Sequence, residues 1–114
     1  RYLYHHALGM ACLRAGLLND ATRELHESLT TNPIWQSRHS NWLGLALAHH
    51  ARGEASEARR YLSMAVEHID DNPAPPDLYG LADWMAVDIL RHEAKRLIGP
   101  PNDPKKETET AQEE

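Results

Sequence analysis

Residues 8–28 read LGMACLRAGLLNDATRELHES, and residues 45–65 read LALAHHARGEASEARRYLSMA. A shift of 37 residues superimposes the two stretches and aligns Gly16 with Gly53. Around these glycines the shift pairs Leu8 with Leu45, Cys12 with His49, Ala21 with Ala58, Leu25 with Leu62 and Ser28 with Ala65. Self-similarity at a fixed period of roughly 20–50 residues is typical of repeat proteins. We therefore expect two copies of one structural unit.

Glycine and proline divide the chain into stretches with helical periodicity, and nothing in the sequence indicates a strand. Five helices are expected over residues 3–15, 19–32, 36 or 40 to 52, 55–69 and 77–98. The side chain of Asn19 is expected to cap the second helix. In the first helix the expected apolar face consists of Leu8, Ala11, Cys12 and Ala15. In the fifth helix it consists of Leu78, Leu81, Ala82, Met85, Ile89 and Leu97.

The composition fits one small domain, because 114 residues with 41% hydrophobic side chains can build one core. A net charge of −5 argues against nucleic acid and anionic membranes as partners. No apolar run is long enough to span a bilayer. The single cysteine, Cys12, excludes an internal disulfide and fits a reducing compartment, so a cytoplasmic location is expected. Because the chain begins at Arg1 and is apolar at once, we expect it to be a segment of a longer protein.

The spacing of small and large residues resembles the tetratricopeptide repeat, whose pattern is W-x2-L-G-x2-Y, then A-x3-F, then P. The first copy has Leu8, Gly9, Cys12, Gly16, Ala21, Leu25, Ser28 and Pro33 in these places. The second copy has Trp42, Leu45, Ala46, Gly53, Ala58, Leu62 and Ala65. The resemblance implies an all-α solenoid in which small residues let helices approach closely. The repeat here is three residues longer than the family's 34, so longer linkers are expected.

The domain organisation follows from this resemblance. It implies a repeat domain over residues 1–98, with hairpins at about 2–33 and 36–70 and a capping helix at about 77–98. Residues 99–114 are expected to form a disordered acidic tail. The segments GEASEARRYLSMAVEHID (53–70) and LRHEAKRLIG (90–99) resemble the end of the repeat region in large bacterial multidomain proteins. Those proteins join such repeats to serine/threonine kinase or WD40-like domains.

Eight histidines are many for a chain of this size, and three interpretations of them compete. A metal site on one helix needs two ligands three or four residues apart, and no two histidines have that spacing. Asp88 and His92 have it but supply only half a site. We therefore expect no metal and no cofactor, although a His-dependent metal-binding or enzymatic role and a pH-sensitive role stay open as alternatives. Common catalytic motifs are absent, so no catalytic residue is predicted.

The concave side of the repeats is the candidate binding site that the resemblance implies. In the family this groove is lined by the first helix of each hairpin. The matching residues here are Leu3, His6, Met10, Leu13, Leu43, Leu47 and His50, with Tyr79 and Asp83 from the fifth helix. Because the strip is apolar, it suits the apolar face of a helix and not a clamped carboxylate. Alternatively, these residues pack against neighbouring helices.

The function predicted from the sequence is that of a non-catalytic protein interaction or scaffolding module. Its partner is expected to be a protein or peptide, with a second copy or upstream repeats of the same chain as other occupants of the groove. A second hypothesis is a purely structural one: the unit is the terminal cap of a longer solenoid and has no ligand of its own.

Overall fold

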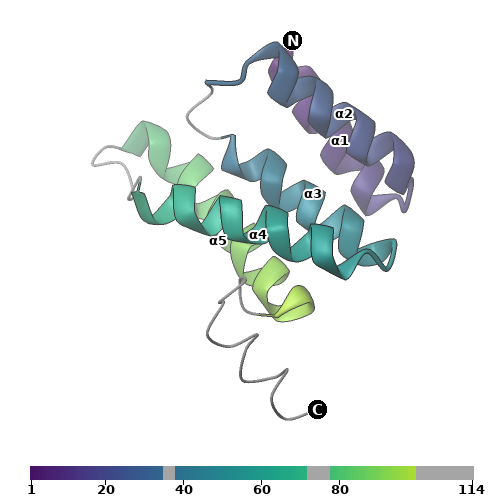
Figure 1. Ribbon diagram of the computed structural model, residues 1–114. Helices are drawn as coiled ribbons and strands as arrows, with labels where there is room; N and C mark the ends of the chain where they lie inside the picture. Colours follow the sequence, from purple (N-terminus) through teal and green to yellow (C-terminus); the bar gives the residue numbers. More distant parts are fainter. Residues whose placement is uncertain (35–37, 72–77, 100–114) are drawn as a thin grey trace.

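A computed structural model describes residues 1–34, 38–71 and 78–99, and gives the backbone alone for residues 78–84. It contains α1 (Tyr2–Arg14), α2 (Leu18–Thr31), α3 (His39–Ala51), α4 (Ala55–Asp71) and α5 (Leu78–Ile98) (Figure 1). These three ranges contain no strand, so the predicted all-α class is confirmed. The helices begin and end within a few residues of the expected positions. The predicted tail after Gly99 lies outside the described residues.

The chain forms two helical hairpins and a fifth helix, and α3 lies at their centre. The first hairpin pairs α1 with α2, the second pairs α3 with α4, and α3 packs against each of the other four helices (Figure 1). Eight of the thirteen residues of α3 are buried for this reason. A helix that is apolar all round is stable in water only when neighbours cover every side, which is the position that α3 occupies. No helix in the described part is long and apolar enough to cross a membrane.

The same turn ends α1 and α3, 37 residues apart. Gly16 and Gly53 have φ angles of +81° and +82°, a conformation that side chains disfavour and glycine adopts without strain. In each turn the amide after the glycine donates to a helix carbonyl five residues back, as in a Schellman motif. These bonds join Leu17 N to Cys12 O and Glu54 N to His49 O, both at 2.9 Å. The aligned glycines of the sequence therefore terminate equivalent helices.

The start of α2 differs from the prediction. The helix begins at Leu18, so Asn19 lies inside its first turn. Leu17 is the N-cap residue, and no side-chain hydrogen bond caps the helix there. Instead, the hydroxyl of Thr22 donates to the carbonyl oxygen of Asn19 at 2.9 Å. Asn19 precedes the apolar stripe as a cap would, but the Schellman turn at Gly16 leads directly into the helix and leaves no room for a separate cap.

Leu25 of α2 joins the two hairpins. Its fully buried side chain fills the space over two helical glycines, Gly9 of α1 and Gly44 of α3. A Cβ atom at Gly9 would lie 2.7 Å from Leu25 Cγ, and one at Gly44 would lie 2.9 Å from Leu25 Cδ1. The expected close approach at Gly9 is therefore present. The sequence analysis assigned no packing role to Gly44.

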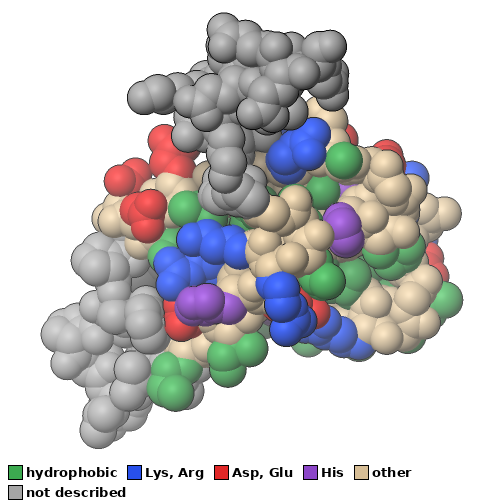
Figure 2. Space-filling view, turned by 90° about the horizontal axis from the view of Figure 1, so that it is seen from below, with side chains coloured by type: hydrophobic (Ala, Val, Ile, Leu, Met, Phe, Trp, Pro, Cys, Tyr) green, Lys and Arg blue, Asp and Glu red, His purple; other side chains and the backbone are tan. Residues whose placement is uncertain are grey.

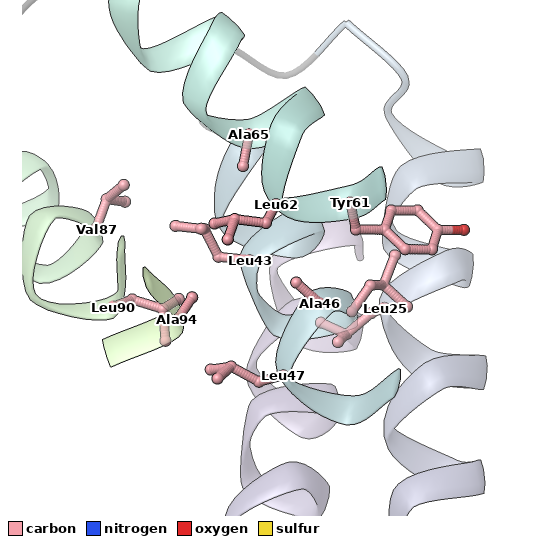
Figure 3. Packing of buried hydrophobic residues seen from close by; sticks show 11 residues of the cluster. Leu25, Leu43, Ala46, Leu47, Tyr61, Leu62, Ala65, Val87, Leu90 and Ala94 are labelled. Carbon is pink, nitrogen blue, oxygen red and sulfur yellow. The ribbon is translucent and has the colours of Figure 1, made fainter. Parts of the chain in front are cut away.

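The apolar faces predicted for α1 and α5 are not their buried faces. In α5 the buried side chains are Val87, Leu90 and Ala94, and they lie against α3 (Figure 3). The predicted residues Met85, Ile89 and Leu97 are exposed, and the side chains of 78–82 lie outside the described part. In α1 the predicted face of Leu8, Ala11 and Ala15 is exposed, with Cys12 half-buried, and only Gly9 is buried. Periodicity locates a stripe but not the neighbour that covers it.

Candidate binding groove between α1 and α5

A hollow of about 330 Å³ lies between α1 and α5, with the start of α3 contributing to its wall. Both helices pack against α3, which leaves the hollow between them. Its lining residues are Leu3, His6, Met10, Arg14, Ser40, Ala86, Val87, Ile89, Leu90 and Glu93. Most of these side chains are apolar. We call this hollow, with these residues, the α1–α5 groove.

Two large apolar side chains in the groove are open to solvent. Leu3 of α1 is 54% exposed and Ile89 of α5 is 69% exposed. Met10 lines the same hollow, and its flexible side chain is half-buried. Apolar side chains that stay exposed on both walls of one hollow are what a binding groove requires, since covering them would release ordered water.

An ion pair ties the two walls together. Both terminal nitrogens of Arg14 donate to the carboxylate of Glu93, each at 2.7 Å. These hydrogen bonds lower the pKa of Glu93 and raise that of Arg14. Arg14 is more than half exposed, so solvent screens much of the attraction, and the pair sets the spacing of α1 and α5 more than it adds stability.

A chain of hydrogen bonds runs from the groove into the core. His6 Nδ1 donates to the amide oxygen of Asn41 at 2.7 Å, and the Asn41 amide nitrogen donates to the Ser28 hydroxyl at 3.1 Å. Ser28 in turn donates to the carbonyl oxygen of Tyr2 at 2.7 Å. Asn41 and Ser28 are fully buried, so the chain satisfies polar groups that would otherwise be costly to bury. It also links α1, α2 and α3.

Three of the predicted groove residues, Leu3, His6 and Met10, line the α1–α5 groove. The others differ. Leu43 and Leu47 are buried in the core with Val87 and Leu90 of α5 (Figure 3), so their placement in an open groove was wrong. Helix α5 covers the surface that the repeat pattern assigned to a ligand.

The remaining predicted residues lie elsewhere or cannot be placed. Leu13 is half-buried and packs against the core, and His50 is exposed outside the groove lining. The side chains of Tyr79 and Asp83 lie outside the described residues. Sequence reasoning missed the α5 wall, although Ala86, Ile89, Leu90 and Glu93 follow one another at helical spacing, which was the available signal.

The histidines make local contacts on several helices. His5 contacts Glu24 at 2.7 Å, His49 contacts Glu54 at 3.4 Å, and His92 contacts the carbonyl oxygen of Asp88 at 2.7 Å. Within the described ranges, no three His, Cys, Asp or Glu side chains come together as metal ligands would. The contacts of these histidines are with single carboxylates or carbonyls.

His26 lies beside Tyr61 of the second hairpin and has a lowered pKa. The ring of His26 lies edge-on to Tyr61, and His49 stacks on Tyr61 at 5.4 Å between centroids. Partial burial lowers the pKa of His26, and the positive charges of His49 and Arg60 lower it further. Since the charged form of His26 is disfavoured in the folded state, acid should destabilise this contact between the hairpins.

The face seen from below is not uniformly apolar. Figure 2 shows Lys and Arg side chains in a band across its middle, with hydrophobic side chains to both sides of the band. Charges therefore divide the apolar surface on this face into small areas.

Comparison of the sequence with protein-family models and with curated proteins, and of the structure with solved structures, finds no match.

Proposed function

We propose that this chain is a tetratricopeptide-like α-solenoid that acts as a non-catalytic protein interaction module. Several features support the repeat arrangement. The two hairpins end their first helices with the same glycine turn, and α3 packs against α1 as α5 packs against α3, one unit further along. The α1–α5 groove would then lie on the concave side, between the first helices of the first and third units.

The ligand we propose is an amphipathic helix of a protein partner that inserts apolar side chains into the α1–α5 groove. The observation that carries this proposal is the exposure of Leu3 and Ile89 on opposite walls of one hollow. A volume of about 330 Å³ holds a few anchor side chains and not a whole helix. Helix recognition uses such anchors, spaced three and four residues apart, while the rest of the helix stays on the rim.

Salt should affect this binding little. The charged groups of the groove, Arg14 and Glu93, neutralise each other, and His6 donates to Asn41. Binding energy would come from burial of Leu3, Met10 and Ile89, which ions do not screen.

Replacement of Ile89 by Glu tests the groove. Helical peptides are selected against the chain from a display library, and the affinity of the best one is measured by fluorescence anisotropy. Loss of the apolar contact costs about 1–2 kcal/mol, so Ile89→Glu should weaken binding about 5- to 30-fold. The control is Ile34→Glu, because Ile34 is 83% exposed and lies outside the groove lining.

Both variants should keep the helical circular dichroism of the parent, since both isoleucines are largely exposed. Equal affinity of the Ile89 and Ile34 variants for the peptide would reject the groove as the binding site. This holds whether or not both variants differ from the parent chain.

A further inference from the structure

The exposed face of α1 is apolar. It comprises Tyr4, Ala7, Leu8 and Ala11, whose spacing places them on one side of the helix. All four are exposed, and Tyr4 is 60% exposed. This face is separate from the α1–α5 groove, because none of the four lines that hollow.

The equivalent face of α3 shows which kind of contact such a face makes. A shift of 37 residues takes these positions to Asn41, Gly44, Leu45 and Ala48 of α3. All four are buried. Two of them contact α2 directly: Asn41 hydrogen-bonds Ser28, and Gly44 lies against Leu25. In α3 this face therefore receives the second helix of the preceding hairpin.

We propose that the exposed face of α1 receives the second helix of another hairpin of this type, as α3 receives α2. The occupant is not the α2 helix of a second copy, because the side chains that α2 would use are already buried. Ala21, Leu25 and Ser28 are completely inaccessible in this chain. Because the equivalent face of α3 packs against α2, we identify the partner as a helix with side chains like those of α2.

The substitutions between the two faces define that helix further. Ala7 stands where α3 has Gly44, and a Cβ at Gly44 would lie 2.9 Å from Leu25. A leucine of the incoming helix would therefore have to shift at that point, whereas a smaller residue fits without a shift. Tyr4 stands where α3 has Asn41, so the helix needs no hydroxyl in the place of Ser28. The face of α1 holds no charge, and an uncharged stripe should cover it.

A duplicated chain tests this inference. A second copy of residues 1–37 is fused ahead of Arg1 of the full chain, which reproduces the natural spacing of 37 residues. In the receiving α1, Ala7→Gly makes room for the leucine of the added α2. Urea and thermal unfolding are then compared with those of the unfused Ala7→Gly chain. We expect one cooperative transition, with a melting temperature raised by about 5 °C or more.

Matched variants locate the contact. Leu8→Glu in the receiving α1 should abolish the rise in melting temperature. Leu17→Glu should leave it unchanged, because Leu17 is exposed in the turn and the equivalent position already carries Glu54. Ile89→Glu should also leave it unchanged, which separates this face from the groove. The fusion with Ala7 retained should show a smaller rise than the fusion with glycine.

Three results would overturn the inference. The added hairpin could unfold separately with no rise in melting temperature, or Leu8→Glu and Leu17→Glu could have equal effects. The third is a dimer of the unfused chain that Leu8→Glu dissociates in sedimentation velocity, since a second copy would then be the occupant.

Discussion

Gly9→Ala should destabilise this protein, although the same change stabilises most helices. In an ordinary helix interior, alanine is favoured over glycine by about 1 kcal/mol. At Gly9 the new Cβ would lie 2.7 Å from Leu25 Cγ and 3.2 Å from the Leu25 backbone nitrogen. The backbone nitrogen cannot move by a side-chain rotation, and Cγ moves only if χ1 of the completely buried Leu25 changes, so overpacking should cost about 2–3 kcal/mol. The free energy of unfolding should fall by about 1–2 kcal/mol.

Leu25→Ala supplies the decisive background, because it removes the Cγ atom that the new methyl group would meet. Leu25→Ala alone should cost about 2–5 kcal/mol, since Leu25 is completely buried. In that background Gly9→Ala should stabilise the protein by about 1 kcal/mol, so the sign of its effect reverses. The two sites should therefore be coupled by about 2–3 kcal/mol.

Gly44→Ala is the internal comparison. Its Cβ would meet Leu25 Cδ1 and Met10 Sδ, both at 2.9 Å, and both are the ends of flexible side chains. Its net effect should lie within about 0.5 kcal/mol of zero, because helix propensity offsets the smaller strain. All variants are compared by urea unfolding followed by far-UV circular dichroism, with the same osmolyte added so that Leu25→Ala stays folded. A stabilising Gly9→Ala in the parent chain would refute the packing argument.

Two further predictions concern polar groups between the hairpins. Asn41→Ala should lower the free energy of unfolding by about 2–3 kcal/mol, because it leaves buried Ser28 and half-buried His6 without their amide partner. In urea titrations, Asn41→Ala combined with Ser28→Ala should cost less than the sum of the two single changes. His26 binds protons less readily in the folded state than its ordinary pKa of 6.5 implies, so unfolded chains take up more protons and stability should fall as pH drops below about 6.5. His26→Gln should flatten that part of the melting temperature profile, and an unchanged profile would contradict the assignment.

The sequence predicted the helices of this fold better than their surroundings. Gly16 and Gly53 mark helix ends because a positive φ is a local requirement, which is visible in one chain. The repeat pattern also identified Ala21, Leu25 and Ser28, which lie on the one apolar stripe of α2 and are buried. Local chemistry decides features of this kind.

The candidate site was harder to predict because it depends on neighbours distant in sequence. Leu43 and Leu47 occupy positions that would line a groove if α5 were absent, but α5 covers them. The open groove lies beside Leu3 and Ile89 instead. Nothing in the spacing of α3 indicates which of its apolar sides a later helix will cover. The same limit explains why Met85, Ile89 and Leu97, which were assigned to the apolar face of the fifth helix, are exposed.

The contrast between α1 and α3 shows why the exposed apolar residues of this protein are informative. Both helices are apolar on nearly every side, yet α3 has eight buried residues and α1 has one. The difference is in their neighbours, because α3 contacts four helices and α1 contacts α2 and α3. Where α1 lacks the neighbours of α3, it exposes Leu3 toward the groove and Tyr4 and Leu8 on its outer face. Exposing apolar surface costs free energy, and the two proposed partners would each cover one of these exposed faces.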